Sequence, residues 1–313
     1  MKKAYILLIG NEGSALVITL LVIATLTALV LSFSEESDIE LNLSAFSRDG
    51  YLAAQTARSG IFIGLSVLER DDNREMDSMR EDWGSFGADS FPEGLTDNAS
   101  LTGSLIDENG KLNINLLRNS NGDIGEKDSE RLKRLFRALE LDENMADPFL
   151  DWLDKDDIER MRGAENSYYQ GLEESYPCSN GPFLTKGQIA LVKGFKEMGV
   201  NLDDYLTIYS DGLVNINTAP VQVLQSLDDE MDKYLAEAIV EYREERDFTN
   251  TSELKNVPGL DEDLYKRIAP LITVKSTCFS IRMRGVCRGA VSEIKAVAVR
   301  ENNEHHLIYW KVM

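Results

Sequence analysis

Residues 13 to 34 form an uncharged, largely apolar segment, and this segment limits the possible folds more than any other feature of the chain. Its 22 residues would make a helix of about 33 Å, because an α-helix rises about 1.5 Å per residue. That length crosses a bilayer. Lys2 and Lys3 precede it, and basic residues on the short N-terminal side favour a cytoplasmic N-terminus. We therefore expect one transmembrane helix, with the bulk of the chain translocated.

The helical pattern continues beyond this segment. Four acidic residues between positions 35 and 40 follow the apolar run, and no proline interrupts the chain before residue 92. The uncharged run is too long for a typical signal-peptide core, and no A-x-A cleavage pattern follows it. A spanning helix that runs directly into an amphipathic helix is the layout of a pilin. The apolar positions of the continuation are Ile39, Leu41, Leu43, Phe46, Leu52, Ala53, Ala57 and Ile61.

Gly13 resembles the cleavage position of type IV pilins and of the pseudopilins of type II secretion, which carry a short basic leader cut after a glycine. Cleavage here would remove residues 1–13 and leave Ser14 as the mature N-terminus. Most such subunits carry Glu at mature position five, where it pairs with a neighbour's N-terminal amine, but this chain has Ile18. Because a buried charge without a partner is costly, a subunit with no neighbour above it has little use for that Glu. The pattern favours a tip subunit; the alternative is an uncleaved anchor with an incidental glycine.

The charge of the chain excludes some partners. Its 313 residues include 54 acidic and 33 basic side chains, a formal charge of −21, with 43% hydrophobic residues. This composition is that of a globular protein whose acidic surface repels nucleic acid and anionic lipid but suits divalent cations or basic partners. The cysteines Cys178, Cys278 and Cys287 have no C-x-x-C spacing, which argues against a zinc site. They are either buried thiols or, outside the cytoplasm, one oxidised pair among three possible pairings.

The rest of the sequence predicts an α+β fold: a pilin-like long N-terminal helix plus an antiparallel sheet, with a large α-helical insertion. A turn and a short strand are expected over 105–117, a helix with one apolar face around residues 132–139, and a short helix over 147–157. Alternating patterns near the C-terminus predict antiparallel strands. We divide the chain into a leader (1–13), a transmembrane half of the helix (14–34), a pseudopilin α+β domain (35–118 and 274–313) and an inserted helical domain (119–273).

Two internal repeats lie in this helical region. The pattern F-x5-[IL]-x2-V-x-G-[FL] begins at Phe183 and again 65 residues later at Phe248. The triplet Gly110, Asn113 and Asn115 recurs 102 residues later as Gly212, Asn215 and Asn217. Since two copies are too few for a solenoid, we expect two helical hairpins of the SAM or helix-hairpin-helix kind.

No catalytic motif is present: the sequence has no GxSxG, HExxH or P-loop pattern. The two histidines, His305 and His306, are adjacent in a predicted polar turn, and neighbouring strand positions point to opposite faces. We expect no enzyme activity. A periplasmic hydrolase, a third class of function, has only an acidic cluster in its favour.

That cluster is the best candidate for a site. The segment DWLDKDDIERMRGAEN has six acidic residues within 15 positions, five of which are candidate ligands, and Ca²⁺ takes six to eight oxygen ligands. The spacing is not that of an EF-hand, because Glu159 stands where the required glycine would be. We expect either a structural Ca²⁺ site of another geometry or a solvated acidic loop. The candidate ligands are Asp151, Asp154, Asp156, Asp157 and Glu165.

Residues 213–260 resemble helix-hairpin-helix modules of competence-type DNA-binding proteins, which bind phosphates through glycine-loop amides backed by basic side chains. Here the second loop reads VPGLDED, and residues 213–268 contain 13 acidic against 6 basic side chains, a balance of −7. That charge opposes DNA. A membrane-anchored DNA-binding protein is therefore our alternative function, and we expect no nucleic-acid partner.

Taken together, these motifs resemble the type II secretion minor pseudopilin K family, also called general secretion pathway protein K. The resemblance covers nearly the whole chain. The sequence departs from the family pattern at Gly187, where a Glu is expected, and has a fairly long leader. The motifs are GSALVITLLVIATLTALVL, AAQTARSGI, Trp83, DENGKLNIN, DWLDKDD followed by GAENSYY, NGPF at residues 180–183, VNINTAPVQVL and the C-terminal strand hairpin.

This resemblance implies an inner-membrane subunit, cleaved by a prepilin peptidase, with its N-terminus in the cytoplasm and its bulk in the periplasm. It implies a subunit that caps the pseudopilus tip, helps to initiate its assembly, and works in the export of folded proteins across the outer membrane. The implied partners are the minor pseudopilins I and J and the major pseudopilin. Ca²⁺ bound near the acidic loop is implied as well.

Overall fold

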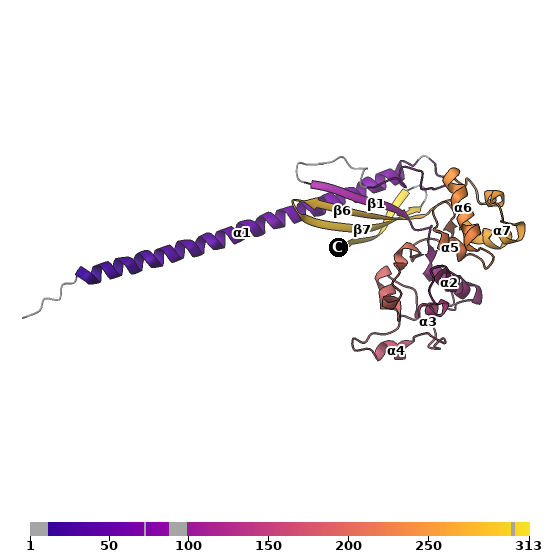
Figure 1. The fold of residues 1–313 in the computed structure, drawn as a ribbon, viewed down its shortest axis with the longest axis horizontal. Coiled ribbons are helices and arrows are strands. Elements are labelled where there is room, and N and C mark those ends of the chain that lie inside the picture. Colours follow the sequence, from indigo (N-terminus) through magenta and orange to yellow (C-terminus); the bar gives the residue numbers. More distant parts are fainter. Residues whose placement is uncertain (1–11, 72, 88–98, 302–303) are drawn as a thin grey trace, which may run out of the picture.

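The computed structural model describes residues 12–71, 73–87, 99–301 and 304–313, so most of the predicted leader lies outside the described residues. A single α-helix, α1 (Glu12–Glu69), extends far from the body of the protein (Figure 1). This agrees with the expected continuation of the helix beyond the membrane segment. The helix is long and apolar enough to cross a membrane, and none of its most apolar window is buried.

Only the C-terminal part of α1 packs on the rest of the chain. Ala53, Ala57, Ile61 and Leu68 are buried and fall at helical spacing, so they form one stripe against the sheet. The apolar residues between the membrane segment and this stripe, from Ile39 to Phe46, remain exposed.

The body of the protein begins with a four-stranded antiparallel sheet of order β1-β6-β7-β8. Its first strand is separated from the other three by the insertion. Gly285 of the second strand allows the close approach of α1, because a Cβ there would lie 2.2 Å from the Ala53 carbonyl oxygen. The strands are β1 (Ala99–Asp107), β6 (Cys278–Cys287), β7 (Ala290–Glu301) and β8 (Glu304–Val312).

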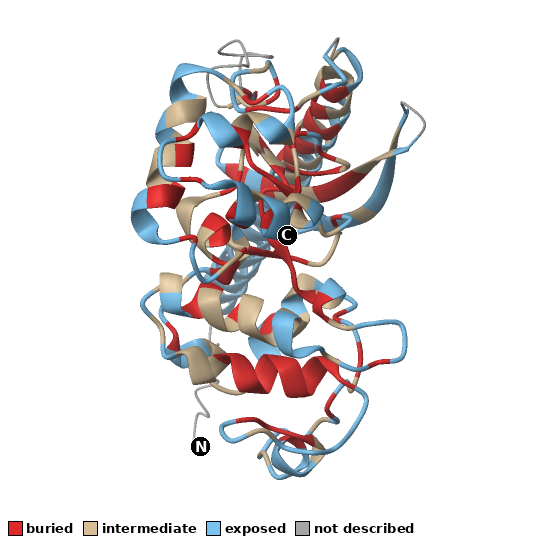
Figure 2. Ribbon diagram, turned by 90° about the vertical axis from the view of Figure 1, so that its right-hand side faces the viewer, coloured by how far each residue is buried: buried red, intermediate tan, exposed pale blue. Residues whose placement is uncertain are grey.

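The insertion between β1 and β6 is mostly helical and lies at the end of the sheet farthest from the N-terminus of α1 (Figure 1). It has its own hydrophobic core, in which α3 is buried on every side (Figure 2). Its elements are β2 (Leu112–Asn113), η2 (Ile114–Leu117), α2 (Glu126–Ala138), η3 (Glu143–Ala146), α3 (Asp147–Leu153), α4 (Asn166–Gln170), η4 (Lys186–Leu191), η5 (Phe195–Glu197), η6 (Leu202–Asp204), β3 (Leu206–Thr207), β4 (Val214–Asn215), α5 (Val221–Gln225), α6 (Lys233–Glu245), η7 (Thr251–Asn256), α7 (Glu262–Ile268), η8 (Ala269–Leu271) and β5 (Ile272–Thr273).

The two sequence repeats are connected in space. The side-chain amide of Asn115 donates to the Phe183 carbonyl (2.9 Å) and accepts from the Phe183 amide (2.8 Å). Asn217 makes the same pair of bonds to Phe248, both at 2.9 Å. In each half of the insertion, an asparagine from the Gly-Asn-Asn repeat therefore holds the phenylalanine that begins the hairpin repeat. The two halves thus contain equivalent pairs of hydrogen bonds.

Buried polar groups join the insertion to the sheet. Glu108, just after β1, contacts Lys111 (2.9 Å) and Lys186 (3.4 Å) and accepts from Ser280 of β6 (2.6 Å). Burial acts to raise the pKa of Glu108, but the two lysines and the hydroxyl bonds outweigh it and lower the pKa to about 2. The junction is thus held by a carboxylate that stays ionised.

Three local predictions need correction or comment. The helix expected over 147–157 ends at Leu153, since Asp154 is extended. His305 and His306 lie in β8 rather than in a turn, and His305 is half-buried, accepting a hydrogen bond from Arg300. All three cysteines are buried and free.

Candidate functional site

The predicted acidic segment folds around the end of α3. Trp152 stacks on Phe183 and meets Tyr169 edge to face, which fixes this helix in the core of the insertion. Asp151 therefore points inward and is fully buried. The chain leaves the helix at Asp154 and returns at Glu165, the residue that precedes α4.

We call the five predicted carboxylates, together with the arginine among them, the Arg160 cluster (Asp151, Asp154, Asp156, Asp157, Glu165 and Arg160). Arg160 Nη1 lies 2.6 Å from Asp151 Oδ1 and 2.5 Å from Asp154 Oδ2. Asp151 Oδ2 accepts from the backbone of Ala164 (2.9 Å). Both oxygens of Asp151 are therefore already bonded within the protein. Gly163 is required beside them, because a Cβ there would lie 1.7 Å from Asp151 Oδ2.

Glu165 differs from its neighbours. Its side chain is 2% exposed, yet neither of its carboxylate oxygens has a hydrogen-bond partner among the described residues. Burial, reinforced by the charges of Asp151 and Asp154, raises the pKa of Glu165 to about 8. A buried carboxylate without partners is costly unless a proton or a cation neutralises it.

Two further oxygens of residues in or beside this cluster are unpaired. Asp154 Oδ1 and Asn180 Oδ1 are buried without hydrogen-bond partners among the described residues. Asn180 belongs to this cluster through its amide nitrogen, which donates to the Asp157 carboxylate at 2.9 Å. The site thus includes Asn180 and Arg160, which the search for carboxylates in the sequence did not select.

These oxygens match the chemistry of a hard cation. One oxygen each from Asp154, Asp156 and Glu165 lie within 4.8 Å of one another. Ca²⁺ binds carboxylate and amide oxygens and tolerates irregular geometry. The residues present therefore fit Ca²⁺, with Asp154, Asp156, Glu165 and Asn180 as candidate ligands and Asp151 engaged by Arg160. The Ca²⁺ site remains a prediction.

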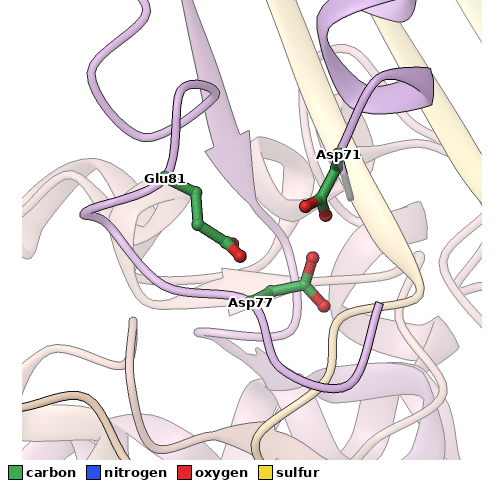
Figure 3. Close-up of side chains that lie close together, drawn as sticks. All are labelled: Asp71, Asp77 and Glu81. Carbon is green, nitrogen blue, oxygen red and sulfur yellow. The ribbon is translucent and has the colours of Figure 1, made fainter. Parts of the chain in front are cut away.

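A second group of carboxylates, which the sequence did not point to, lies where α1 meets the sheet. We call it the Arg300 cluster: Asp71, Asp77, Glu81 and Arg300. The three acidic side chains converge (Figure 3), with one oxygen of each within 4.8 Å of the others. Arg300 of β7 lies 3.2 Å from Asp71 and 2.9 Å from Asp77, so the guanidinium joins the end of α1 to the sheet.

Most oxygens of the Arg300 cluster already have partners. Asp77 Oδ2 accepts from Ser276 and Arg300, and Glu81 Oε2 accepts from Ser78 and from the Trp83 indole (2.8 Å). Burial raises the pKa of Asp77 to about 7, against the opposing effect of Arg300. Glu81 Oε1 and Asp77 Oδ1 are buried without hydrogen-bond partners among the described residues, but Asp77 Oδ1 lies 2.9 Å from Arg300. Each carboxylate of the Arg300 cluster therefore has at least one bonded oxygen, and the cluster acts mainly as a buried cross-link.

The helix-hairpin-helix region has acidic residues and a paired basic side chain around its glycine loop. In the second hairpin the glycine loop ends at Gly259, whose φ is +92°, and acidic residues follow it. Lys255, a basic side chain beside the loop, pairs with Glu262 at 2.9 Å, and Asp261 caps α7. The charges near this loop oppose a nucleic-acid ligand.

Comparisons with known proteins bear on both regions. A family model described as type II secretion system protein K matches residues 110–211, and a helix-hairpin-helix motif matches residues 210–273. The type II secretion system protein K of Aeromonas hydrophila is 26% identical over 318 aligned residues, covering 92% of each chain. The fold is similar to that of a chain in the GspK-GspI-GspJ complex of the enterotoxigenic Escherichia coli type 2 secretion system, with a TM-score of 0.70 and 16% identity. That match covers 86% of this chain and 99% of the solved one.

Proposed function

This chain belongs to the family of type II secretion system protein K, a minor pseudopilin, and on that premise we propose that it caps the tip of the pseudopilus and helps to initiate its assembly. The proposed place of action is the inner membrane and periplasm, with the N-terminus of α1 in the cytoplasm. Its work there is structural and serves the export of folded proteins across the outer membrane.

The position of the insertion carries this proposal. The insertion lies beyond the end of the sheet that points away from the membrane part of α1 (Figure 1). A subunit of the same kind stacked above would meet this bulk, whereas the space below, along α1, is free of it. Ile18 supports the same conclusion, because it offers no carboxylate to the N-terminal amine of a neighbour.

Assembly is tested with the full chain and its proposed partners, the minor pseudopilins I and J. The three full-length proteins, co-expressed and extracted in mild detergent, are expected to elute as one complex. The control is the major pseudopilin expressed with I and J alone. Failure of the chain to enter a complex at micromolar concentrations would contradict the proposal.

Maturation by a prepilin peptidase belongs to the same proposal. Cleavage after Gly13 would leave Ser14 as the first residue. Intact mass measurement of the membrane-extracted chain, with and without the peptidase, is expected to show loss of residues 1–13. A mass equal to that of the uncut chain in cells with active peptidase would identify an uncleaved anchor instead.

We further propose that the Arg160 cluster holds a structural Ca²⁺ ion. The support is the unpaired, buried carboxylate of Glu165 beside the unpaired oxygen of Asp154. Calorimetric titration of the EDTA-treated chain with Ca²⁺ is expected to show one saturable site that Glu165→Gln removes. Equal heats for the two proteins would contradict the assignment.

A further inference from the structure

The sheet is wider than the helix that covers it. Four strands spaced about 4.8 Å apart span about 14 Å between the outer strand axes, whereas a helix is about 10 Å across with its side chains. Helix α1 packs against β6, β7 and β1 but touches β8 only marginally. Most residues of β8 are exposed on both faces. Among the described residues, therefore, nothing but the edge of α1 covers this strand on the α1 side.

A β-bulge collects the apolar side chains of β8 on that uncovered face. Ile294, Ala296 and Ala298 of β7 belong to the core beneath α1, and their partners on β8 are Val312, Trp310 and Leu307. Directly paired residues point to the same face of a sheet. Side chains alternate between the two faces along a regular strand, which would place Leu307 and Trp310 on opposite faces. Ile308 has no partner on β7 because of the bulge, so Leu307 and Trp310 lie on the same face.

The uncovered face and the side of α1 enclose a groove of about 490 Å³. Several large apolar side chains in its wall are exposed: Phe62 (52%), Leu307 (38%), Trp310 (38%) and Val312 (58%). A contiguous apolar surface of this kind marks a site of association rather than an ordinary exposed residue. The complete lining is Ala54, Gln55, Arg58, Phe62, Ile294, Leu307, Trp310 and Val312.

Arg58 is the one charged residue in this lining. It is exposed and has no ion-pair partner among residues 12–71, 73–87, 99–301 and 304–313. The groove therefore differs from the rest of this acidic chain, whose formal charge is −21, because its lining includes a positive charge and no negative one. It complements a partner that brings apolar side chains and one carboxylate.

We propose that this groove, defined as the β8 groove, receives a helix of a partner pseudopilin, laid beside α1 over β8. This inference rests on the proposed function, which supplies a pilin-like partner. The groove lies beside α1, since residues of α1 and of β8 both line it, and a second helix there would complete the cover that one helix cannot provide. The partner helix would place apolar residues against Trp310 and Leu307 and a carboxylate near Arg58.

The chain itself shows that a pilin helix carries such chemistry. The exposed part of α1 between the membrane segment and the body combines acidic residues, including Asp38 and Glu40, with the exposed apolar residues Ile39, Leu41 and Leu43. A similar segment in a partner would have the composition that the β8 groove requires. A second copy of this chain is the competing occupant, and the experiment separates the two.

The test places a photo-reactive p-benzoylphenylalanine at position 310 of the full chain, co-expressed with the minor pseudopilins I and J in membranes. We expect a crosslink to the long helix of I or J, located by mass spectrometry. The matched control carries the probe at Ile308, which is 54% exposed on the same strand but does not line the groove. Its yield is expected to be at least tenfold lower. Equal yields, a crosslink to a partner strand, or a crosslink to a second copy would overturn the inference.

Affinity provides an independent measurement. Arg58→Glu and Leu307→Glu are each expected to weaken binding of the full chain to the I and J pair by about 30-fold or more, as at interface hot spots. The control is Lys311→Glu, an exposed charge reversal on β8 outside the groove lining. Circular dichroism checks that all variants remain folded. Unchanged affinity of folded Arg58→Glu and Leu307→Glu would overturn the β8 groove while the proposed function stands. Absence of binding by the unmodified chain would overturn both.

Discussion

The Arg160 cluster and the Arg300 cluster each bring three carboxylates within 4.8 Å of one another, and each includes one arginine. They differ in whether any carboxylate lacks hydrogen-bond partners on both of its oxygens. In the Arg300 cluster, Asp77 is bonded to Ser276 and Arg300, and the arginine side chain is only 12% exposed. In the Arg160 cluster, both oxygens of Glu165 are free of hydrogen bonds within the described residues, and the arginine is 28% exposed.

A high density of acidic residues therefore does not by itself identify a cation site. A guanidinium held between buried carboxylates acts as a permanent counter-ion, and the cluster then cross-links the fold. Buried oxygens that no protein group satisfies require something from outside, either a proton or a metal ion. The two clusters should therefore respond differently to mutation and to Ca²⁺, and only the pH dependence of the Arg160 cluster should be sensitive to Ca²⁺.

The largest effect is expected from Arg300→Met. It leaves the buried Asp77 without its cation, and breaking a buried pair in this way costs about 3–5 kcal/mol of the free energy of unfolding. Thermal or denaturant unfolding of the detergent-solubilised chain measures it, with Trp83 fluorescence reporting on this junction, since its indole donates to Glu81. Arg267→Met is the control, because its pairs with Asp228 and Glu230 are at the surface and surface pairs contribute at most about 1 kcal/mol. Equal losses for the two variants would show that the Arg300 cluster is not a cross-link.

An intermediate effect is expected from Glu165→Gln: the substitution should lower the stability of the chain in Ca²⁺ and raise it in EDTA. With Ca²⁺ at 100 times its Kd, the unmodified chain should gain about 2.7 kcal/mol of stability, and the variant should lose most of that gain. In EDTA at pH 8 the variant should instead be the more stable protein, because it no longer buries an unpaired carboxylate. Trp152 fluorescence during thermal unfolding follows this region. Glu81→Gln, the matched change in the Arg300 cluster, should retain the full response to Ca²⁺. A Ca²⁺ response that both variants keep would contradict the Arg160 site.

The smallest expected effect is on the pH dependence of stability, which Ca²⁺ should change for the Arg160 cluster and not for the Arg300 cluster. The folded pKa of Glu165, about 8, exceeds its ordinary value of 4.5, so the folded chain holds a proton that the unfolded chain has released. Stability from this group is therefore present below about pH 4.5 and is lost as pH rises towards 8. In EDTA, the stability of Glu165→Gln relative to the unmodified chain should thus increase between pH 5 and pH 8. Saturating Ca²⁺ should remove this slope by replacing the proton.

The matched control for that slope is Asp77→Asn. The pKa of Asp77 is raised from 3.8 to about 7, so its contribution is also lost as pH rises, over the window from 3.8 to 7. Because Arg300 and Ser276 rather than a metal ion surround it, its slope should be the same with and without Ca²⁺. If Ca²⁺ abolished the pH dependence of the stability of Asp77→Asn relative to the unmodified chain, the ion would bind in the Arg300 cluster, and the assignment to the Arg160 cluster would be contradicted.

Sequence reasoning identified the features that depend on neighbouring residues. The uncharged run and the unbroken helical pattern predicted α1, because helix periodicity and length are local properties. The α+β class, the family resemblance and the loop from Asp151 to Glu165 were also readable, since acidic side chains with such short spacing necessarily lie near one another. The repeat of asparagines was visible, but not the bonds from Asn115 to Phe183 that explain it.

Which charged groups have partners depends on contacts that form only in the folded chain. Arg300 meets Asp71 and Asp77 across more than two hundred residues, and no local pattern predicts such a contact. The same holds for Asn180, which joins the Arg160 cluster from a separate loop. On β8, the sequence alternation alone would place Leu307 and Trp310 on opposite faces, and the bulge reverses this. The helix, its apolar length and the number of carboxylates follow from the order of residues alone. Packing sets burial and hydrogen-bond partners, and so it determines which of those carboxylates lack partners within the protein.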